Sequence, residues 1–138
     1  MVTREDIESF LDRLSSEGGG SSYTEVEPGL WIVRLPGALD LDVVVNYSPP
    51  VVVLRTKVMN VPHTEAAAAN LNRRLLQLNA TDLVHGSYGI ERDAIVLTEA
   101  LELAHLDYEE FQASYEGMTL ALTAHLRELA AFRDAASA

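Results

Sequence analysis

The sequence contains no cysteine. This absence excludes thiol nucleophiles, thiolate metal ligands and disulfide-based redox switches. It also agrees with a cytoplasmic location, as does the N-terminal segment, where Glu5 and Asp6 replace the basic start and apolar stretch of a signal peptide. We therefore expect a cytoplasmic protein that is stabilised by a hydrophobic core.

Basic residues are also scarce. Lys57 is the only lysine, and ten basic residues stand against 21 acidic ones, which gives a net charge of −11. Binding to a phosphate backbone requires clustered Lys and Arg side chains that displace counterions. We therefore do not expect nucleic acid as a partner and favour a protein partner, one that could be basic. A weak single-stranded nucleic-acid-binding accessory protein is an alternative, because basic residues are concentrated at Arg55, Lys57, Arg73 and Arg74. If the predicted sheet forms, we expect the aromatic residues Trp31 and Tyr47 near them.

Long apolar runs are missing as well. None approaches the roughly 20 residues that cross a bilayer, so we expect no membrane association. The 138 residues are 48% hydrophobic and 22% charged, which is the balance of a globular protein. The sequence predicts a single domain over 1–138, long enough to bury a sizeable core.

Motifs for catalysis are not found either. Four histidines are too widely separated in the sequence to suggest a metal site: His63, His85, His105 and His125. There is no GxSxG nucleophile motif. The glycine run 18–20 precedes Ser-Ser-Tyr, whereas a phosphate-binding loop would continue with Gly-Lys-Ser. We therefore predict a non-enzymatic protein with no catalytic residues, no cofactor and no bound metal.

The first element that the sequence predicts is an amphipathic helix over 3–15. Thr3 can cap its N-terminus together with Asp6, and apolar residues then recur at the spacing of one helical face: Ile7, Phe10, Leu11 and Leu14. A flexible Gly/Ser linker over 17–23 should follow. This linker predicts that the helix packs at a variable distance from the rest of the chain.

The middle of the chain has the turn spacing of an antiparallel sheet. Three strand-like segments form a meander with turns at Pro36-Gly37 and 48–50: 30–35, 41–47 and 51–59. A helix over 64–79 follows, with Thr64 as its cap, and then a hairpin of strands 83–90 and 94–101.

Two of the predicted strands have consecutive apolar residues instead of an alternation. Val43–Val45 and Val51–Leu54 are the runs concerned, and such runs are typical of strands covered on both faces. A domain of this size has little helix to cover a second face. That face is therefore a candidate for a subunit or partner interface, although buried irregular segments could equally cover it.

The last predicted helix is the longest element and begins after Asp107. Its apolar positions alternate in steps of three and four: Tyr108, Phe111, Tyr115, Met118, Leu122, His125, Leu129 and Phe132. At 1.5 Å per residue it is about 40 Å long, which exceeds the roughly 20 Å of a typical strand. It either packs across its own sheet or meets a neighbouring chain, and His125 is a core or interface histidine.

The element order resembles two related groups of proteins, the YbjN-like family of sensory transduction regulators and the class I type III secretion chaperones. The similarity covers nearly the whole chain and is clearest in Leu30–Arg34, the helix Ala66–Asn79 and the segment Gly89–Leu97. The resemblance implies an α+β fold of the secretion-chaperone type: helix, three-stranded antiparallel meander, helix, β-hairpin and long C-terminal helix. It also implies a homodimer that offers apolar surface to a client.

Together these features predict a homodimeric protein-binding module, chaperone-like or regulatory, that binds a segment of a partner protein. The interface candidates are apolar residues of the meander, the middle helix and the last helix: Val44, Val52, Leu54, Leu71, Leu75, Leu78, Met118, Leu122, His125 and Leu129. A second hypothesis is a small-ligand-sensing regulatory domain, with its pocket between the first helix and the sheet.

Overall fold

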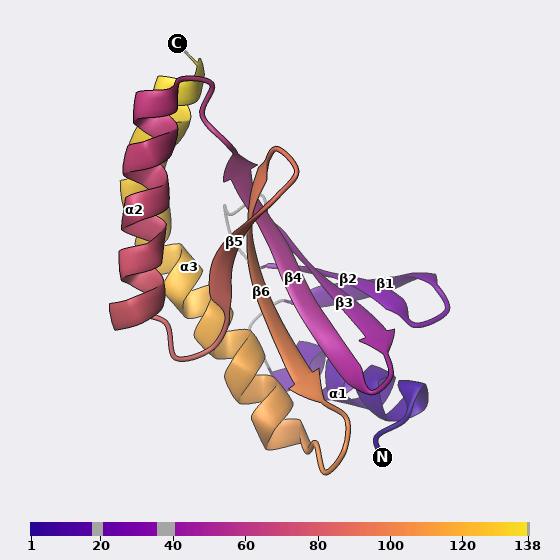
Figure 1. Ribbon diagram of the computed structural model, residues 1–138. Coiled ribbons are helices and arrows are strands. Elements are labelled where there is room, and N and C mark those ends of the chain that lie inside the picture. The colour runs from indigo at the N-terminus through magenta and orange to yellow at the C-terminus, as the bar shows by residue number, and fades with distance from the viewer. Residues whose placement is uncertain (18–20, 36–40, 138) are drawn as a thin grey trace.

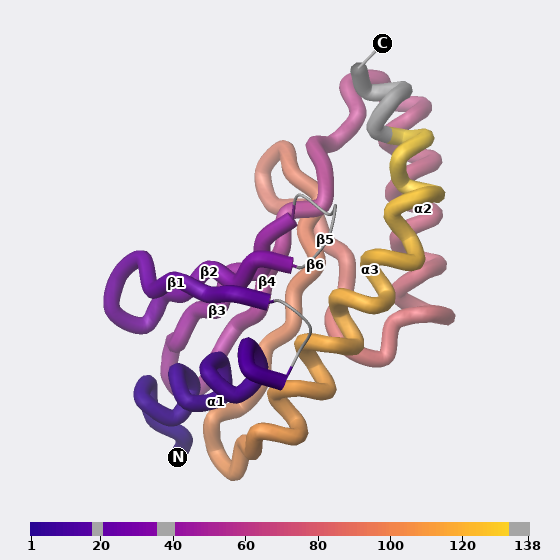
Figure 2. Tube along the Cα trace, turned by 180° about the vertical axis from the view of Figure 1, so that it is seen from behind, coloured from indigo at the N-terminus to yellow at the C-terminus, as the bar shows by residue number. Residues whose placement is uncertain are grey.

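The chain folds into a six-stranded antiparallel sheet with helices on one face. The computed structural model describes residues 1–17, 21–35 and 41–137, with side chains as far as residue 132. The sheet has the strand order β1-β2-β3-β4-β6-β5. Helices α1 and α3 lie on one face of the sheet, called the inner face below, and α2 lies beside the β5 edge (Figures 1 and 2). The elements are α1 Arg4–Glu17, β1 Ser22–Glu27, β2 Leu30–Arg34, β3 Asp42–Ser48, β4 Val51–Asn60, α2 Glu65–Thr81, β5 Ser87–Glu91, β6 Ala94–Glu102 and α3 Tyr108–Ser137.

The predicted α+β fold is confirmed, including the meander, the hairpin and the long last helix. The predicted turn at Pro36-Gly37 lies outside the described residues. The first strand of the hairpin starts later than predicted, because 83–86 form the connection from α2 and Gly86 has a φ of +82°. None of the described helices combines the length and the apolar character that a membrane span requires.

The strand β1 was not predicted. Its residues are exposed except for the half-buried Tyr23, so no alternation of apolar residues marks it. It is an edge strand that pairs only with β2, and a bulge interrupts the pairing between Glu25 and Glu27. The signal that could have revealed it is Pro28-Gly29, a turn pair in which Gly29 has a φ of +82°.

Helix α1 is capped as predicted, but the linker after it differs from the prediction. The amide of Thr3 donates to the Asp6 carboxylate at 2.9 Å, and the amide of Asp6 donates to the Thr3 hydroxyl at 3.2 Å. The helix continues to Glu17, and Ser22 and Tyr23 belong to β1, so the linker predicted over 17–23 is too long at both ends. Its central Gly18–Gly20 lies outside the described residues.

Helix α1 packs against the sheet, and its variable distance from the rest of the chain stays a prediction. Ile7, Leu11 and Leu14 are buried in the main core. Arg4 forms an ion pair with Glu25 of β1 at 2.7 Å, and the Tyr23 hydroxyl donates a hydrogen bond to Asp12. Buried apolar contacts and polar contacts thus join α1 to the sheet.

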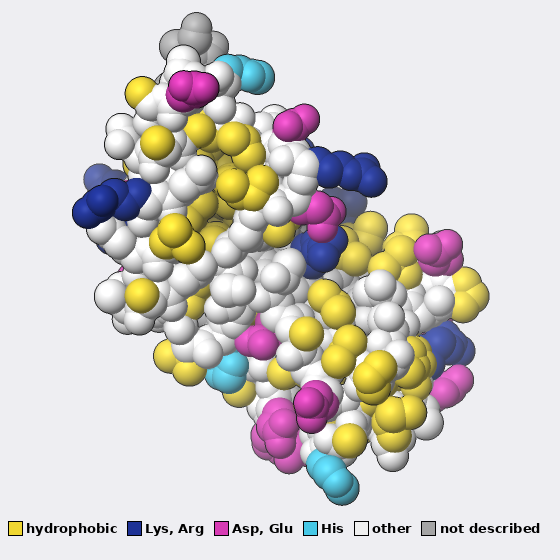
Figure 3. Space-filling model, viewed as in Figure 1, with side chains coloured by type: hydrophobic (Ala, Val, Ile, Leu, Met, Phe, Trp, Pro, Cys, Tyr) yellow, Lys and Arg dark blue, Asp and Glu magenta, His cyan; other side chains and the backbone are white. Residues whose placement is uncertain are grey.

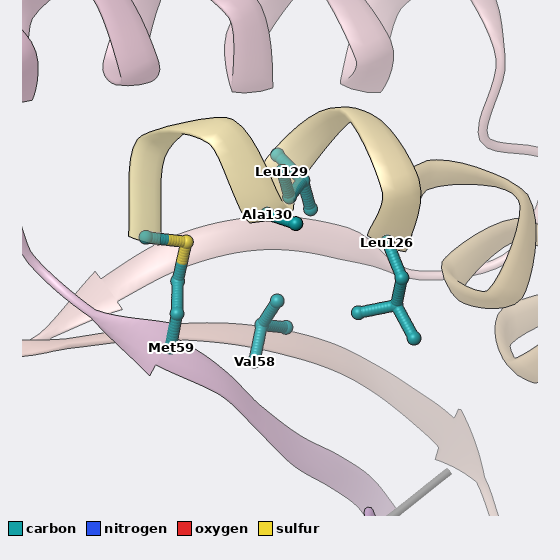
Figure 4. Close-up of a pocket in the computed structure, with 5 residues that line it drawn as sticks. All are labelled: Val58, Met59, Leu126, Leu129 and Ala130. Atoms are coloured by element: carbon teal, nitrogen blue, oxygen red, sulfur yellow. The ribbon is translucent and has the colours of Figure 1, made fainter. Parts of the chain in front are cut away.

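Helix α3 packs across its own sheet, which decides between the two alternatives left open for it. Of the eight seam residues, seven are buried and Phe132 is partly buried against the same core. Figure 4 shows the far end of this packing, where Val58 and Met59 of β4 face Leu126, Leu129 and Ala130 of α3. The gap between them is about 10 Å³, at the lower limit of what one water molecule needs.

Candidate functional site

Nine of the ten interface candidates lie in the interior of the single chain. Their side chains belong to the hydrophobic core or, for His125, to a buried polar cluster, and each is at most 6% exposed: Val52, Leu54, Leu71, Leu75, Leu78, Met118, Leu122, His125 and Leu129. Val44 is the exception and is half-buried. A partner could not reach these nine side chains without opening the core, whereas the opposite faces of the same elements are accessible.

Strand alternation explains why Val44 is accessible. Successive side chains of a strand point to opposite faces of the sheet. Val43 and Val45 of β3 are fully buried on the inner face, which places Val44 between them on the outer face. In β4, Val52 and Leu54 are likewise buried, and Val51 and Val53 are half-buried. The consecutive apolar residues thus supply the core on the inner face and half-buried aliphatic side chains on the outer face.

The outer side of the sheet carries five half-buried aliphatic side chains, here called the outer patch: Leu30, Ile32, Val44, Val51 and Val53. Ile32 pairs with Val44, and the exposed Asn46 of β3 lies between Leu30 and Val53 as the cross-strand partner of both. Figure 3 shows hydrophobic side chains gathered over β2, β3 and β4 on this face, with no described helix in front of them.

Charged residues border the outer patch at one end. Arg34 pairs across the strands with Asp42, and Arg55 lies next to Val44 in the register. Arg55 forms an ion pair with Glu91 of β5 at 2.5 Å. Lys57 follows Arg55 on the same face of β4. This end of the face thus carries three cations and two carboxylates, in a chain whose acids outnumber its bases by about two to one.

A second hollow lies between α2 and β5. It has a volume of about 330 Å³, and residues on its walls include Leu75, Leu76 and Ile90. The side chain of Asn79 lines this hollow. It accepts a hydrogen bond from the Tyr88 amide at 2.7 Å and donates one to the Tyr88 carbonyl at 3.1 Å. In this way an amide side chain of α2 replaces a neighbouring strand at the β5 edge.

The chain contains one buried polar cluster that sequence inspection missed. The hydroxyl of Tyr88 lies 2.7 Å from Nδ1 of His125, and Nε2 of His125 lies 3.2 Å from a carboxylate oxygen of Asp82. Burial raises the pKa of Tyr88 well above its usual range. Hydrogen bonds from Thr81 and then from His125 lower the pKa of Asp82. His125 is only 6% exposed, whereas the Asp82 side chain is 48% exposed, and the three residues join the end of α2 to β5 and α3.

A second histidine, His85, also makes its contacts within the fold. His85 contacts Ser114 at 3.4 Å and lies 3.8 Å from the carboxylate of Glu99. Its ring packs where a side chain of Gly117 would be, since a Cβ there would come within 2.7 Å of the His85 ring. No group of three metal-ligating side chains is found among the residues that the structure describes.

Comparison with known proteins identifies the family. The sequence profile of CesT_Tir_1 matches residues 2–135, which is nearly the whole chain. The chain belongs to the CesT_Tir_1 family. No curated protein sequence matches this family member.

Solved structures share the fold of this CesT_Tir_1 family member at low sequence identity. YbjN from E. coli has a TM-score of 0.65 at 15% identity, covering 95% of this chain and 96% of that one. ExsC in the ExsC-ExsE complex has a TM-score of 0.63 at 16% identity, covering 92% and 96%. The ExoU-SpcU complex of the Pseudomonas aeruginosa type III secretion system gives 0.60 at 13% identity, covering 88% and 95%. The predicted YbjN-like and secretion-chaperone-like fold is therefore confirmed.

The small-ligand hypothesis placed a pocket between the first helix and the sheet. In this CesT_Tir_1 family member, Ile7, Leu11 and Leu14 of α1 are buried against the core. These three side chains thus belong to the core, and the small-ligand hypothesis stays a prediction. The outer patch is an aliphatic part of the sheet that no described helix covers.

Proposed function

We propose that this protein is a cytoplasmic, non-enzymatic and chaperone-like module, which acts as a homodimer and holds a segment of a partner protein on its outer patch. One observation carries the proposal: five aliphatic side chains around Val44 form one surface that no described helix of the chain covers. Contiguous apolar surface of this kind marks an interaction site in soluble proteins.

The relatives support a partner of protein type. ExsC is solved with ExsE, SpcU with ExoU, and SchA with HopA1 in what is described as a chaperone-effector complex. By analogy, the occupant of the outer patch is another polypeptide, and a small metabolite is disfavoured. Full burial of an aliphatic side chain contributes about 1.5–3 kcal/mol, so completing the burial of five half-buried ones supplies several kcal/mol towards binding.

The test is a substitution in the middle of the outer patch. Val44→Glu places a charge among Ile32, Val53 and Arg55 and should abolish capture of the partner, which a photo-crosslinking residue at Val51 can detect in cells. Leu120→Glu is the matched control, because Leu120 is 69% exposed on α3, remote from the patch. Equal crosslinking in the wild type and V44E would contradict the proposal.

For the homodimer we propose an interface on the exposed side of α2. No acidic residue occurs between Ala66 and Thr81, whereas the rest of the chain is strongly acidic, so repulsion between two copies is smallest there. Ala69, Leu76 and Ala80 line a wide hollow on that side together with Arg73. Light scattering should give twice the 15.1 kDa chain mass, and Leu76→Glu should reduce it to one. A monomer mass for the wild type at micromolar concentration would contradict the dimer.

A further inference from the structure

We propose that the segment held on the outer patch is an amphipathic α-helix with acidic residues on one flank. This inference deepens the proposed function, because it names the chemistry of the partner at the same surface. In folded domains, an apolar sheet face is covered by helices or by a second sheet, whereas a polar face of an antiparallel sheet can face water. Here α1 and α3 cover the inner face, and the outer patch is the corresponding surface without a cover (Figures 1 and 3).

Backbone hydrogen bonding favours a helix over an extended segment on this surface. The outer patch offers aliphatic side chains and no free backbone groups. An extended segment laid across it would leave amide and carbonyl groups unpaired against apolar atoms, which is unfavourable. A helix satisfies these groups internally. Strand addition at the sheet edges is also hindered, because Asn79 occupies the β5 edge at Tyr88 and a bulge between Glu25 and Glu27 interrupts β1.

The dimensions of the patch agree with a helix. It extends over the three neighbouring strands β2, β3 and β4, which at about 4.8 Å between strands gives roughly 10 Å. An α-helix with side chains is about 10–12 Å wide. Along the strands, Val51 lies four residues from Arg55, the cross-strand partner of Val44, which is about 13 Å and corresponds to between two and three helical turns of contact.

The charged residues at the border of the outer patch determine which charge the polar side of the bound helix should carry. Among the described residues, no carboxylate lies within ion-pair distance of Arg34 or Lys57, and Arg55 pairs with Glu91 alone. At 0.15 M salt, exposed charges act over only about 8 Å, so at this end of the patch the three cations outweigh the two carboxylates, Asp42 and Glu91. Glu102 lies at the other end, as the cross-strand partner of Val51. The total charge would favour a basic partner, whereas this surface favours acidic residues next to Lys57.

Two synthetic peptides test the inference. Both are capped 18-residue helices with the same Leu/Ile face, one with Glu and the other with Lys on the polar flank. Fluorescence anisotropy at 0.15 M salt should show the Glu peptide binding at least about 10-fold more tightly, with a gain of helical circular dichroism. A Glu peptide with two central prolines should not bind, since proline interrupts the helix. Tighter binding of the Lys peptide, or equal binding of the proline peptide, would overturn the inference.

Three variants assign the binding to the outer patch. Val44→Glu should abolish binding of the Glu peptide, and Lys57→Glu should weaken it at least about 5-fold. Arg127→Glu changes the net charge equally on the exposed surface of α3 and should leave the affinity within about 2-fold. An unchanged affinity in V44E would overturn the inference, as would loss of the dimer mass in V44E, because a second copy would then cover the patch. If neither peptide binds while Val51 still crosslinks to a partner in cells, the helix inference fails and the proposed function stands.

Discussion

The hydroxyl of Tyr88 on β5 and the imidazole of His125 on α3 form a buried hydrogen bond of 2.7 Å. The Tyr88 amide also donates to the Asn79 side-chain oxygen, and the Tyr88 carbonyl accepts from the Asn79 side-chain nitrogen, so one residue of β5 is joined to α3 and to α2. The three elements meet where the sheet has no further strand.

Tyr88→Phe should destabilise the fold by about 1–3 kcal/mol, because the imidazole nitrogen of His125 would remain buried without a partner. Urea unfolding followed by circular dichroism measures this loss. Tyr47→Phe is the matched control, since its hydroxyl lies 3.4 Å from the Val2 carbonyl and is only part-buried, and it should cost less than about 1 kcal/mol. Equal costs for the two variants would show that the Tyr88–His125 bond contributes little.

Tyr23 should make the stability fall at alkaline pH. The hydrogen bond from its hydroxyl to Asp12 is the main cause that raises its pKa from 10.0 to about 12, and burial adds to it. A raised pKa in the folded state means that the neutral phenol is stabilised by folding. This contribution is complete below pH 10 and is lost as the pH rises towards 12. Tyr23→Phe should therefore flatten the unfolding free energy between pH 9 and 12, and an unchanged slope would contradict the assignment.

Gly117→Ala should destabilise the fold by about 1–3 kcal/mol, although alanine is the better helix former by about 1 kcal/mol. The reason is steric, since the new Cβ would lie 2.7 Å from the His85 ring. A thermal melt measures the effect. In a His85→Ala background the same substitution should become neutral or stabilising, because the obstructing ring is gone. A loss that persists in that background would indicate another cause.

Arg92→Gly should stabilise the protein. Arg92 lies in the turn between β5 and β6 and has a φ of +55°. In this left-handed region of backbone conformation, residues with a Cβ are strained by about 1–2 kcal/mol. Glycine has no such strain, although the greater freedom of its unfolded state offsets part of the gain. We expect a gain of up to about 1 kcal/mol in chemical unfolding. Arg92→Ala retains the Cβ and should bring no gain, which separates backbone strain from loss of the charge.

Periodicity made most of the fold predictable. The stripe Leu71, Leu75 and Leu78 defined α2, and the seam from Tyr108 to Phe132 defined α3, because a helix that buries one face must repeat its apolar residues every three to four positions. The edge strand β1 has no buried face to repeat, so the same reasoning could not find it.

The surface for a partner was harder to predict than the fold. A run such as Val43–Val45 shows that apolar residues point both ways, but it does not show which of them the helices cover. The apolar stripes of α2 and α3 indicated burial, and burial against the chain's own sheet has the same pattern as burial against a second copy. The Tyr88–His125 bond joins residues 37 positions apart and has no local signal.

The amide of Asn79 has a consequence for solubility. A sheet that ended in an unoccupied strand could add an identical strand from another molecule, and then another, until a fibre formed. With Asn79 bound to both backbone groups of Tyr88, that lateral growth is hindered at the β5 edge. At the opposite edge, the bulge between Glu25 and Glu27 interrupts the regular edge of β1 and opposes the same kind of growth.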